Sequence, residues 1–325
     1  MKLSILDQAP ISKGQTPGAA LEASRQLAEV GDKYGYTRFW VAEHHALPNL
    51  ASSAPEVMLG YIGAHTERIR IGSGAVLLPY YKPYKVAESF NMLATLFKDR
   101  VDIGIGRAPG GPAEASEALS DGFLQQVFRM PDLVDELIGY VDKNDELAAN
   151  PEPPVEPALW MLGTSRKSAA FAAEKGLSYC FGQFMSKEDG KEILEHYREN
   201  FIPRKKGQGP QTIMGVSVIC AETAEAAYDI ARSWLIWQVQ QSHGGAEGIP
   251  SIEEAKAWEL SGEDEEQLKA MQSKMIIGNP EEVVAALDRI QKETDVDEFM
   301  IITITFSPED KRDSYRYIAE TLHKK

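Results

Sequence analysis

Residues 69–107, IRIGSGAVLLPYYKPYKVAESFNMLATLFKDRVDIGIGR, contain the pattern that decides the fold. Two short apolar runs, 69–78 and 101–107, predict strands. Residues 83–97 between them predict a helix, with Pro83 near its first turn. A helix between two strands is typical of a parallel strand pair, because parallel strands need a long crossover connection. The stretch therefore predicts one strand–helix–strand unit.

The same order recurs along the chain of 325 residues. Further strands are predicted at 3–8, 38–43, 158–163, 177–182, 212–221 and 298–306. Helices are predicted at 17–34, 54–66, 165–175, 187–201, 223–239 and 308–323, with a long helical stretch ending near Lys143 and a helix beginning at Pro280. Eight units predict an α/β fold, a (β/α)8 TIM barrel forming a single domain over residues 1–325. The alternative fold is an open doubly wound sheet. It is expected to carry a G-x-G-x-x-G fingerprint after the first strand, which LDQAPISKG (6–14) lacks.

Residues 240–276 interrupt this rhythm with polar sequence, including SHGGAEGIPS (242–251) and SGEDEEQ (261–267). They lie between two predicted helices, so we expect an insertion near the C-terminal mouth of the barrel. One interpretation is a helical decoration of the surface. The other is an active-site lid, which Gly244 and Gly245 would help to hinge.

Charge and composition exclude several classes of partner. The net charge is −15, from 34 basic and 49 acidic side chains, which argues against nucleic-acid binding. Cys180 and Cys220 are isolated within apolar runs, which indicates buried thiols in a reducing compartment. The N-terminus lacks the pattern of a signal peptide, and no apolar run is long enough to span a membrane. We therefore expect a cytoplasmic protein.

Active sites of TIM barrels lie at the C-terminal ends of the strands, so the residues there are the first candidates. Arg107 ends the fourth predicted strand, and GTSRKS (163–168) follows the fifth. Gly163 would form a tight turn into a helix whose first turn presents the hydroxyls of Thr164, Ser165 and Ser168. These hydroxyls are typical helix caps, but a helix N-terminus beside an arginine also attracts an anion. We predict a site for a phosphorylated ligand.

Small residues in the third strand give a second indication. IGSGAVLLP (71–79) places Gly74 and Ala75 where a barrel strand usually has bulky side chains. A glycine within a strand commonly marks a bulge or a close approach by a ligand. A flat ring system against Gly74 and Ala75 would explain the pattern, and so would tight packing against a neighbouring helix.

Glu43, His44 and His45 end the second predicted strand. A metal site needs three or four ligands, and the other histidines form no pair at ligand spacing, so we expect no metal. A histidine beside a carboxylate suits proton transfer near neutral pH. His44 and Glu43 are therefore the candidate acid/base residues, although an isolated histidine is most often structural.

Together these motifs resemble the bacterial luciferase-like flavin monooxygenase family. The resemblance covers nearly the whole chain and rests on FWVAEHH (39–45), 69–88, RVDIGIGRAPGG (100–111), MLGTSRKSAAFAAEKGL (161–177) and IIGNPEEV (276–283). It implies a (β/α)8 barrel that binds reduced FMN, or in one branch a deazaflavin cofactor, at the C-terminal mouth. Gly106 stands where luciferase itself has a reactive cysteine, so light emission is not implied.

The resemblance also implies roles for individual residues. Arg107, Thr164, Ser165 and Ser168 match positions that bind the flavin phosphate. Gly74 and Ala75 match a non-prolyl cis peptide beneath the isoalloxazine ring. His44 matches the acid/base group, Glu43 a polar neighbour that orders the site, and His45 a more distant supporting residue.

The expected activity is an FMN-dependent monooxygenation of a small organic substrate, with reduced flavin supplied by a separate flavin reductase and dioxygen as co-substrate. Two alternatives stay open: a deazaflavin-dependent dehydrogenase or reductase on the same barrel, and a flavin-binding protein without turnover. Tyr80, Tyr81 and Phe184 either line the substrate pocket or belong to the core. The family also implies a homodimer formed through the second and third helices, where Val57, Met58 and Ile62 are equally compatible with core packing.

Overall fold

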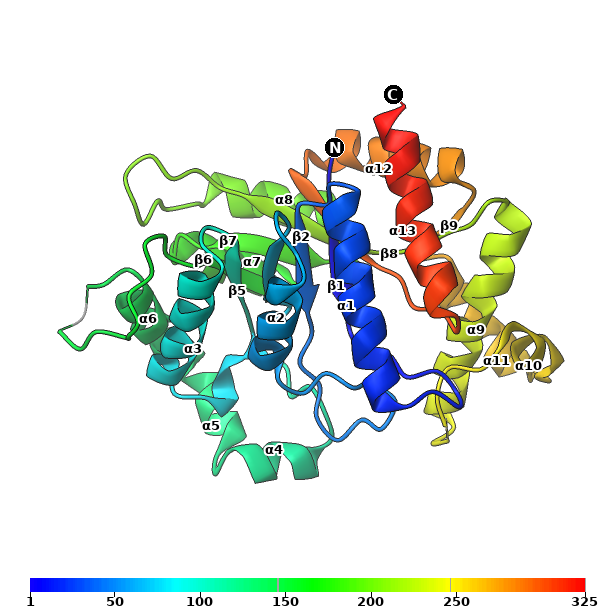
Figure 1. Cartoon of the computed structure of the whole chain (residues 1–325), viewed down its shortest axis with the longest axis horizontal. Helices are drawn as coiled ribbons and strands as arrows, with labels where there is room; N and C mark the ends of the chain where they lie inside the picture. The colour runs from blue at the N-terminus through cyan, green and yellow to red at the C-terminus, as the bar shows by residue number, and fades with distance from the viewer. Residues whose placement is uncertain (145, 246, 325) are drawn as a thin grey trace.

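The fold is a closed parallel barrel surrounded by helices (Figure 1). The computed structural model describes residues 1–144, 146–245 and 247–324. Eight strands of this described chain form the barrel: β1 (Lys2–Asp7), β2 (Arg38–Val41), β3 (Arg70–Ser73), β5 (Val101–Gly106), β6 (Ala158–Gly163), β7 (Ser178–Gly182), β8 (Thr212–Cys220) and β10 (Glu298–Ile302). Because β10 pairs in parallel with both β8 and β1, the sheet closes on itself. The predicted TIM barrel is confirmed.

Two short strands differ from the prediction. The strand predicted at 69–78 is divided into β3 and β4 (Val76–Leu77), and β4 also pairs with β5. β9 (Met275–Gly278) pairs with the second half of β8 and extends the sheet beside the barrel. The four residues of β9 are too few to show a periodic pattern, so the sequence does not reveal this strand.

Most of the helices follow the prediction. Those around the barrel are α1 (Pro17–Lys33), α2 (Pro55–Ala64), α3 (Pro83–Leu96), α7 (Arg166–Glu174), α8 (Gly190–Glu199), α9 (Ala224–Ser242), α12 (Pro280–Thr294) and α13 (Pro308–His323). A short 3-10 helix, η1 (Leu78–Tyr80), follows β4. α1 and α13 lie side by side, next to the two chain termini (Figure 1).

The helical stretch predicted to end near Lys143 ends at Val141, but it is not continuous. It consists of three helices, α4 (Ala113–Leu119), α5 (Phe123–Phe128) and α6 (Met130–Val141). Gly122 caps the start of α5, and Pro131 lies in the first turn of α6. Proline fits a first turn but interrupts a helix interior, because it lacks an N–H and its ring clashes with the preceding turn. The breaks place α4 and α5 below α3 in the view of Figure 1.

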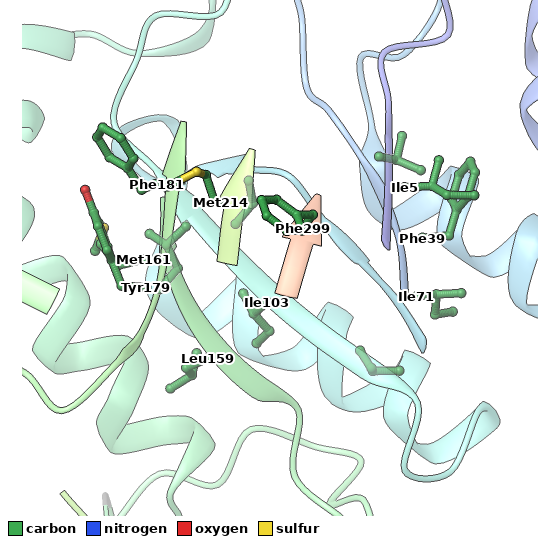
Figure 2. Close-up of a cluster of buried hydrophobic side chains, with 14 of the residues drawn as sticks. Ile5, Phe39, Ile71, Ile103, Leu159, Met161, Tyr179, Phe181, Met214 and Phe299 are labelled. Carbon is green, nitrogen blue, oxygen red and sulfur yellow. The ribbon is translucent and has the colours of Figure 1, made fainter. Parts of the chain in front are cut away.

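Alternate side chains of the strands face two different cores. Ile5, Phe39, Ile103 and Phe299 belong to the large cluster between strands and helices, which Figure 2 shows around the sheet. The residues that follow them in the chain, such as Leu6, Trp40 and Met300, belong to a smaller cluster inside the barrel. This alternation follows from the two-residue period of a strand. It determines which side chains at the strand ends face the barrel axis.

The insertion packs against α9 and the loop that follows β1 at the C-terminal end of the barrel. It contains α10 (Ile252–Ala257) and α11 (Gly262–Gln272), which pack against α9. Ile249 pairs with Ser12 in the loop after β1 and is fully buried beside Trp237 and Phe306. The Lys13 ammonium lies 2.5 Å from the Glu254 carboxylate. These contacts fasten the insertion to the loop after β1.

The N-terminal end of the barrel is closed by a buried ionic network. Arg38 Nε donates to Glu298 Oε1 at 2.7 Å, and Arg38 Nη1 donates to Asp102 Oδ2 at 2.9 Å. Arg70 Nη2 donates to Asp102 Oδ1 at 2.7 Å, and the Trp40 indole N–H donates to Asp102 Oδ2 at 3.0 Å. Burial raises the pKa of Asp102, but the two guanidinium groups outweigh it and hold that pKa below its usual range.

Both cysteines are buried and free, as expected. Among the described helices, none combines the length and the apolar character that a membrane crossing requires.

Candidate active site

A cavity of about 590 Å³ opens at the C-terminal end of the barrel. Its lining comes from the ends of several strands, which is where barrel enzymes place their chemistry. All of the candidate residues line it: Glu43, His44, Gly74, Ala75, Arg107, Gly163, Thr164, Ser165 and Ser168. The structure therefore brings together residues that are separated by more than a hundred positions in the chain.

His44 faces the barrel axis. Trp40 and Ala42 belong to the interior cluster, and Val41 belongs to the outer one, so the alternation carries His44 to the cavity side. Its Nδ1 is buried and has no hydrogen-bond partner among the described residues. Burial, helped by the neighbouring His45, lowers the pKa of His44 to about 4. The imidazole is therefore neutral near pH 7 and has an unused ring nitrogen.

The Glu43 side chain is held in place by three polar partners. Its carboxylate accepts hydrogen bonds from the Leu77 N–H at 2.9 Å and the Tyr81 hydroxyl at 2.7 Å. Nε2 of His45 lies 2.8 Å from Glu43 Oε1. Burial raises the pKa of Glu43, although these three hydrogen bonds act in the opposite direction. Glu43 thus ties the backbone beside His44 to β4, through Leu77, and to Tyr81 after η1.

Tyr80 and Tyr81 do not line the cavity, so both belong to the supporting structure. Tyr81 bonds to Glu43, as described above. The Tyr80 hydroxyl donates to the Pro109 carbonyl at 2.6 Å and lies 2.7 Å from Ser116 Oγ, while its ring stacks on Phe123 with centroids 4.8 Å apart. Phe184, in contrast, does line the cavity.

The peptide bond between Gly74 and Ala75 is cis, as the resemblance implies. A Cβ added to Gly74 would lie 2.6 Å from Cδ1 of Leu6 and 3.1 Å from Cβ of Trp40. Crowding by side chains of β1 and β2, and not by a helix, therefore favours glycine at position 74. Both residues still line the cavity, so a flat ring placed against them remains compatible with the structure.

The turn after β6 is built as a helix cap. Ser165 is the N-cap of α7, and its backbone N–H donates to Ser168 Oγ at 3.2 Å. Ser168 Oγ also donates to the Ser165 carbonyl at 2.7 Å and lies 2.9 Å from the Tyr179 hydroxyl. A Cβ on Gly163 would lie 2.1 Å from Ser168 Oγ, so this position requires glycine. The capping interpretation holds for Ser165 and Ser168.

Two unpaired cations stand beside this cap. Arg107 and Lys167 line the cavity, and neither has an ion pair or side-chain hydrogen bond within the part of the chain that the structure describes. Both side chains are exposed. Cations beside a helix N-terminus attract an anion, because the helix dipole and the free N–H groups add to their charge. The arrangement can hold a phosphate.

Sequence reasoning missed several lining residues. Lys167 lies within the stretch already considered, and Gln8 follows β1 as Arg107 follows β5, so strand-end position could have revealed both. Met185 also lies shortly after a strand, β7, whereas Phe128 follows no such rule. No described residue of 240–276 lines the cavity, whereas Val127, Phe128, Met130 and Pro131 do. The cavity is therefore bordered by the α5–α6 region, whereas the insertion contacts the loop after β1.

Within the described residues, no group of three or more histidine, cysteine, aspartate or glutamate side chains is arranged to hold a metal ion. The ionisable side chains that line the cavity near its polar end are instead the neutral imidazole of His44, the buried carboxyl of Glu43 and the cations Arg107 and Lys167, and the uncharged Gln8, Thr164, Ser165 and Ser168 line it as well.

Comparison with known proteins identifies the family. The model of the luciferase-like monooxygenase family matches residues 1–298. The chain belongs to the luciferase-like monooxygenases. The relative named N-acetyl-S-alkylcysteine monooxygenase, from Bacillus subtilis (strain 168), is 33% identical over 330 residues and the match covers 99% of this chain and 98% of the relative. The YceB protein of the same organism, an uncharacterized protein, is 38% identical over 325 residues, with 98% of each chain covered.

Solved structures agree with this membership. The crystal structure of apo-MsnO8 has a TM-score of 0.89 and 34% identity, and covers 99% of this chain and 98% of its own. Two more distant structures show the fold alone: an oxygenating constituent of 3,6-diketocamphane monooxygenase with FMN (TM-score 0.71, 17% identity) and an F420-dependent secondary alcohol dehydrogenase with an F420-acetone adduct (0.63, 15%). Each spans 98% of this chain and 97% or 98% of its own. The resemblance and the assignment as a flavin-dependent oxidoreductase of the monooxygenase type are confirmed.

Proposed function

We propose that this luciferase-like monooxygenase uses reduced FMN and dioxygen to oxygenate a small organic substrate in the cavity at the barrel mouth. The observation that carries the proposal is that two cations without an ion pair among the described residues, Arg107 and Lys167, line the same cavity as the neutral His44. An anion-binding end and a proton-transfer group in one enclosure suit a phosphorylated redox cofactor and its substrate.

The residues present fit FMN. Arg107, Lys167 and Thr164 would hold the phosphate at the N-terminus of α7. The isoalloxazine ring would lie against the Gly74–Ala75 segment, above Leu6 and Trp40. Reduced FMN supplies the electrons that activate dioxygen, one atom of which is transferred to the substrate.

The chain contributes positioning and proton transfer. Neutral His44 presents a free ring nitrogen that can accept or return a proton beside the flavin. Glu43 fixes the backbone next to it through Leu77 and Tyr81. Most of the remaining lining is apolar, which keeps water from the reacting atoms.

The proposal includes two protein partners. Reduced FMN would come from a separate flavin reductase. A second copy of the chain would bind at α2 and α3, where Val57, Tyr61, Met92 and Leu96 are exposed to 69%, 44%, 55% and 66%. Met58 and Ile62 are buried in the core, so they would not belong to this interface.

The first substrates to test are S-alkyl thioethers, because a full-length relative is named for N-acetyl-S-alkylcysteines. A second candidate function is a deazaflavin-dependent dehydrogenase, which the F420-dependent structure of the same fold supports. The cation pair would hold the phosphate of either cofactor. A protein that binds flavin without turnover is the third alternative.

The test is a single turnover with ¹⁸O-labelled dioxygen. The protein is loaded anaerobically with reduced FMN and an N-acetyl-S-alkylcysteine, then mixed with labelled oxygen while flavin absorbance is followed. We expect reoxidation kinetics that depend on protein concentration and one labelled oxygen atom in the product. Kinetics identical to those of free FMN at every protein concentration would contradict the proposal. Anaerobic reduction of the deazaflavin by a secondary alcohol would favour the second candidate.

A further inference from the structure

Two large apolar side chains lie at the rim of the cavity and point to the kind of substrate it accepts. Phe128, the last residue of α5, is 84% exposed, and Met185, after β7, is 63% exposed. Both line the cavity. Large exposed apolar side chains at the edge of a binding cavity usually become covered when a ligand binds.

The segment that carries Phe128 is anchored from behind. The Tyr80 ring stacks on Phe123 of α5, and the Tyr80 hydroxyl contacts Pro109 and Ser116 on the preceding stretch. η1 and α5 are therefore packed together, while Phe128 itself stays in solvent. Phe128 is therefore exposed although the helix that carries it is packed against η1.

Met185 is also placed by specific contacts. The next residue, Ser186, is buried and donates from its hydroxyl to the Thr164 carbonyl at 2.8 Å. A Cβ on Gly182 would lie 3.3 Å from both Met185 Cε and Thr164 Cγ2. The thioether thus lies next to the turn that leads into α7. Its flexible side chain can adjust to ligands of different shape.

We propose that Phe128 and Met185 bind an apolar arm of the substrate that extends from the cavity to its rim. Val127, Pro131 and Phe184 line the same cavity and provide further apolar surface for that arm. The substrate class is then a molecule with an oxidisable group at one end and a hydrocarbon or aromatic arm at the other. This inference rests on the proposed function and adds the part of the substrate that does not react.

The occupant is a substrate and not a second copy of the chain. Phe128 and Met185 both line the cavity, whereas the exposed apolar residues of α2 and α3, Val57, Met92 and Leu96, do not. The rim residues are therefore part of the cavity lining, whereas the proposed dimer face on α2 and α3 is separate from it. An aromatic side chain such as Phe128 can bury roughly 150 Å² or more against such an arm.

The experiment measures binding of n-alkan-1-ols of four to ten carbons by calorimetry, without cofactor and with oxidised FMN. Wild type is compared with Phe128→Ala, Met185→Ala and the matched control Met92→Ala, whose methionine is 55% exposed on α3. In wild type we expect affinity to rise about fourfold for each added methylene. Phe128→Ala should bind decan-1-ol about tenfold more weakly and butan-1-ol unchanged. Met185→Ala should show a smaller loss of the same kind, and Met92→Ala none.

Equal dependence on chain length in wild type and Phe128→Ala would overturn the inference. So would an equal loss in Met92→Ala, because that residue lies outside the cavity lining. Sedimentation of the same variants tests the competing occupant: a shift in self-association by Phe128→Ala with unchanged alkanol binding would assign the rim to a second copy. The alkanol series needs no flavin, so a failure of FMN binding would contradict the proposed function without affecting this measurement.

Discussion

The two ends of the barrel differ in how their charged side chains are paired. At the N-terminal end, Arg38 and Arg70 donate to Asp102 and Glu298, and all four are tied into one network. At the C-terminal end, Arg107 and Lys167 have no acidic partner within the described chain, and Nδ1 of His44 has no hydrogen bond. Both ends contain several polar groups, so polarity alone does not distinguish them.

The difference shows where the chain leaves interactions for a ligand. A buried charge without a partner is costly, so a purely structural end is expected to satisfy its polar groups internally. The N-terminal network does so with Arg38, Asp102 and Glu298 buried and Arg70 half-buried at its edge. At the mouth, the exposed Arg107 and Lys167 and the buried Nδ1 of His44 have no partner among the described residues, and a ligand in the cavity would provide partners for all three.

The largest effect is expected at His44. His44→Ala should lower turnover by about 10²- to 10⁴-fold, because it removes the proposed proton-transfer group. The measurement is the rate of product formation with reduced FMN and dioxygen. His65→Ala provides a control, because His65 ends α2 and lies outside the cavity. Full turnover in His44→Ala would contradict the catalytic assignment.

Stability should respond most strongly at the other end of the barrel. Arg38→Ala leaves Glu298 and part of Asp102 unpaired in the interior, and should lower the free energy of unfolding by about 3–5 kcal/mol. Urea denaturation measures the change. Arg107→Ala is the matched comparison, and its denaturation midpoint should stay unchanged because Arg107 has no partner in the described protein. Similar losses in both variants would remove the distinction between the two ends.

Glu43 combines features of both ends, since it is buried and paired yet adjoins the cavity. Glu43→Gln should lower the free energy of unfolding by about 1–3 kcal/mol, because an amide cannot accept from Leu77, Tyr81 and His45 as a carboxylate does. Tyr81→Phe should cost about 1 kcal/mol, since it removes one of these bonds. A larger loss in Tyr81→Phe than in Glu43→Gln would show that Glu43 is not the centre of the cluster.

A further prediction concerns pH. The pKa of His44 is about 4 in the folded protein and near 6.5 when unfolded, so the unfolded chain binds more protons between these values. His44 therefore stabilises the fold above about pH 6.5, and this contribution falls as the pH drops toward 4. His44→Asn should flatten the pH dependence of the denaturation midpoint in this window. An unchanged profile would mean that His44 is not buried as described.

Much of the fold follows from local sequence. The strand cores are apolar runs next to amphipathic helices, and their number predicts the closed barrel. β9 and the division of 113–141 into α4, α5 and α6 were missed, because short elements depend on tertiary contacts and on single residues such as Gly122 and Pro131. Helix periodicity continues across such breaks and hides them.

The residues of the candidate site could be predicted where they directly follow the end of a strand. Glu43, His44 and Arg107 follow strand ends, and the barrel gathers these ends at one mouth. Contacts between distant residues were not predictable. Tyr81 lies 38 positions from Glu43, and Glu298 lies 260 positions from Arg38, so no local pattern connects either pair.

The central claim is tested most directly by equilibrium binding of FMN, riboflavin and the deazaflavin cofactor to wild type and to Arg107→Ala. We predict that wild type prefers FMN to riboflavin, and that Arg107→Ala weakens FMN binding at least about tenfold while leaving riboflavin unchanged. This pattern would show that the unpaired mouth cations bind the cofactor phosphate. Preference for the deazaflavin would favour the dehydrogenase. Equal affinity for FMN and riboflavin, or no flavin binding by wild type, would contradict the account.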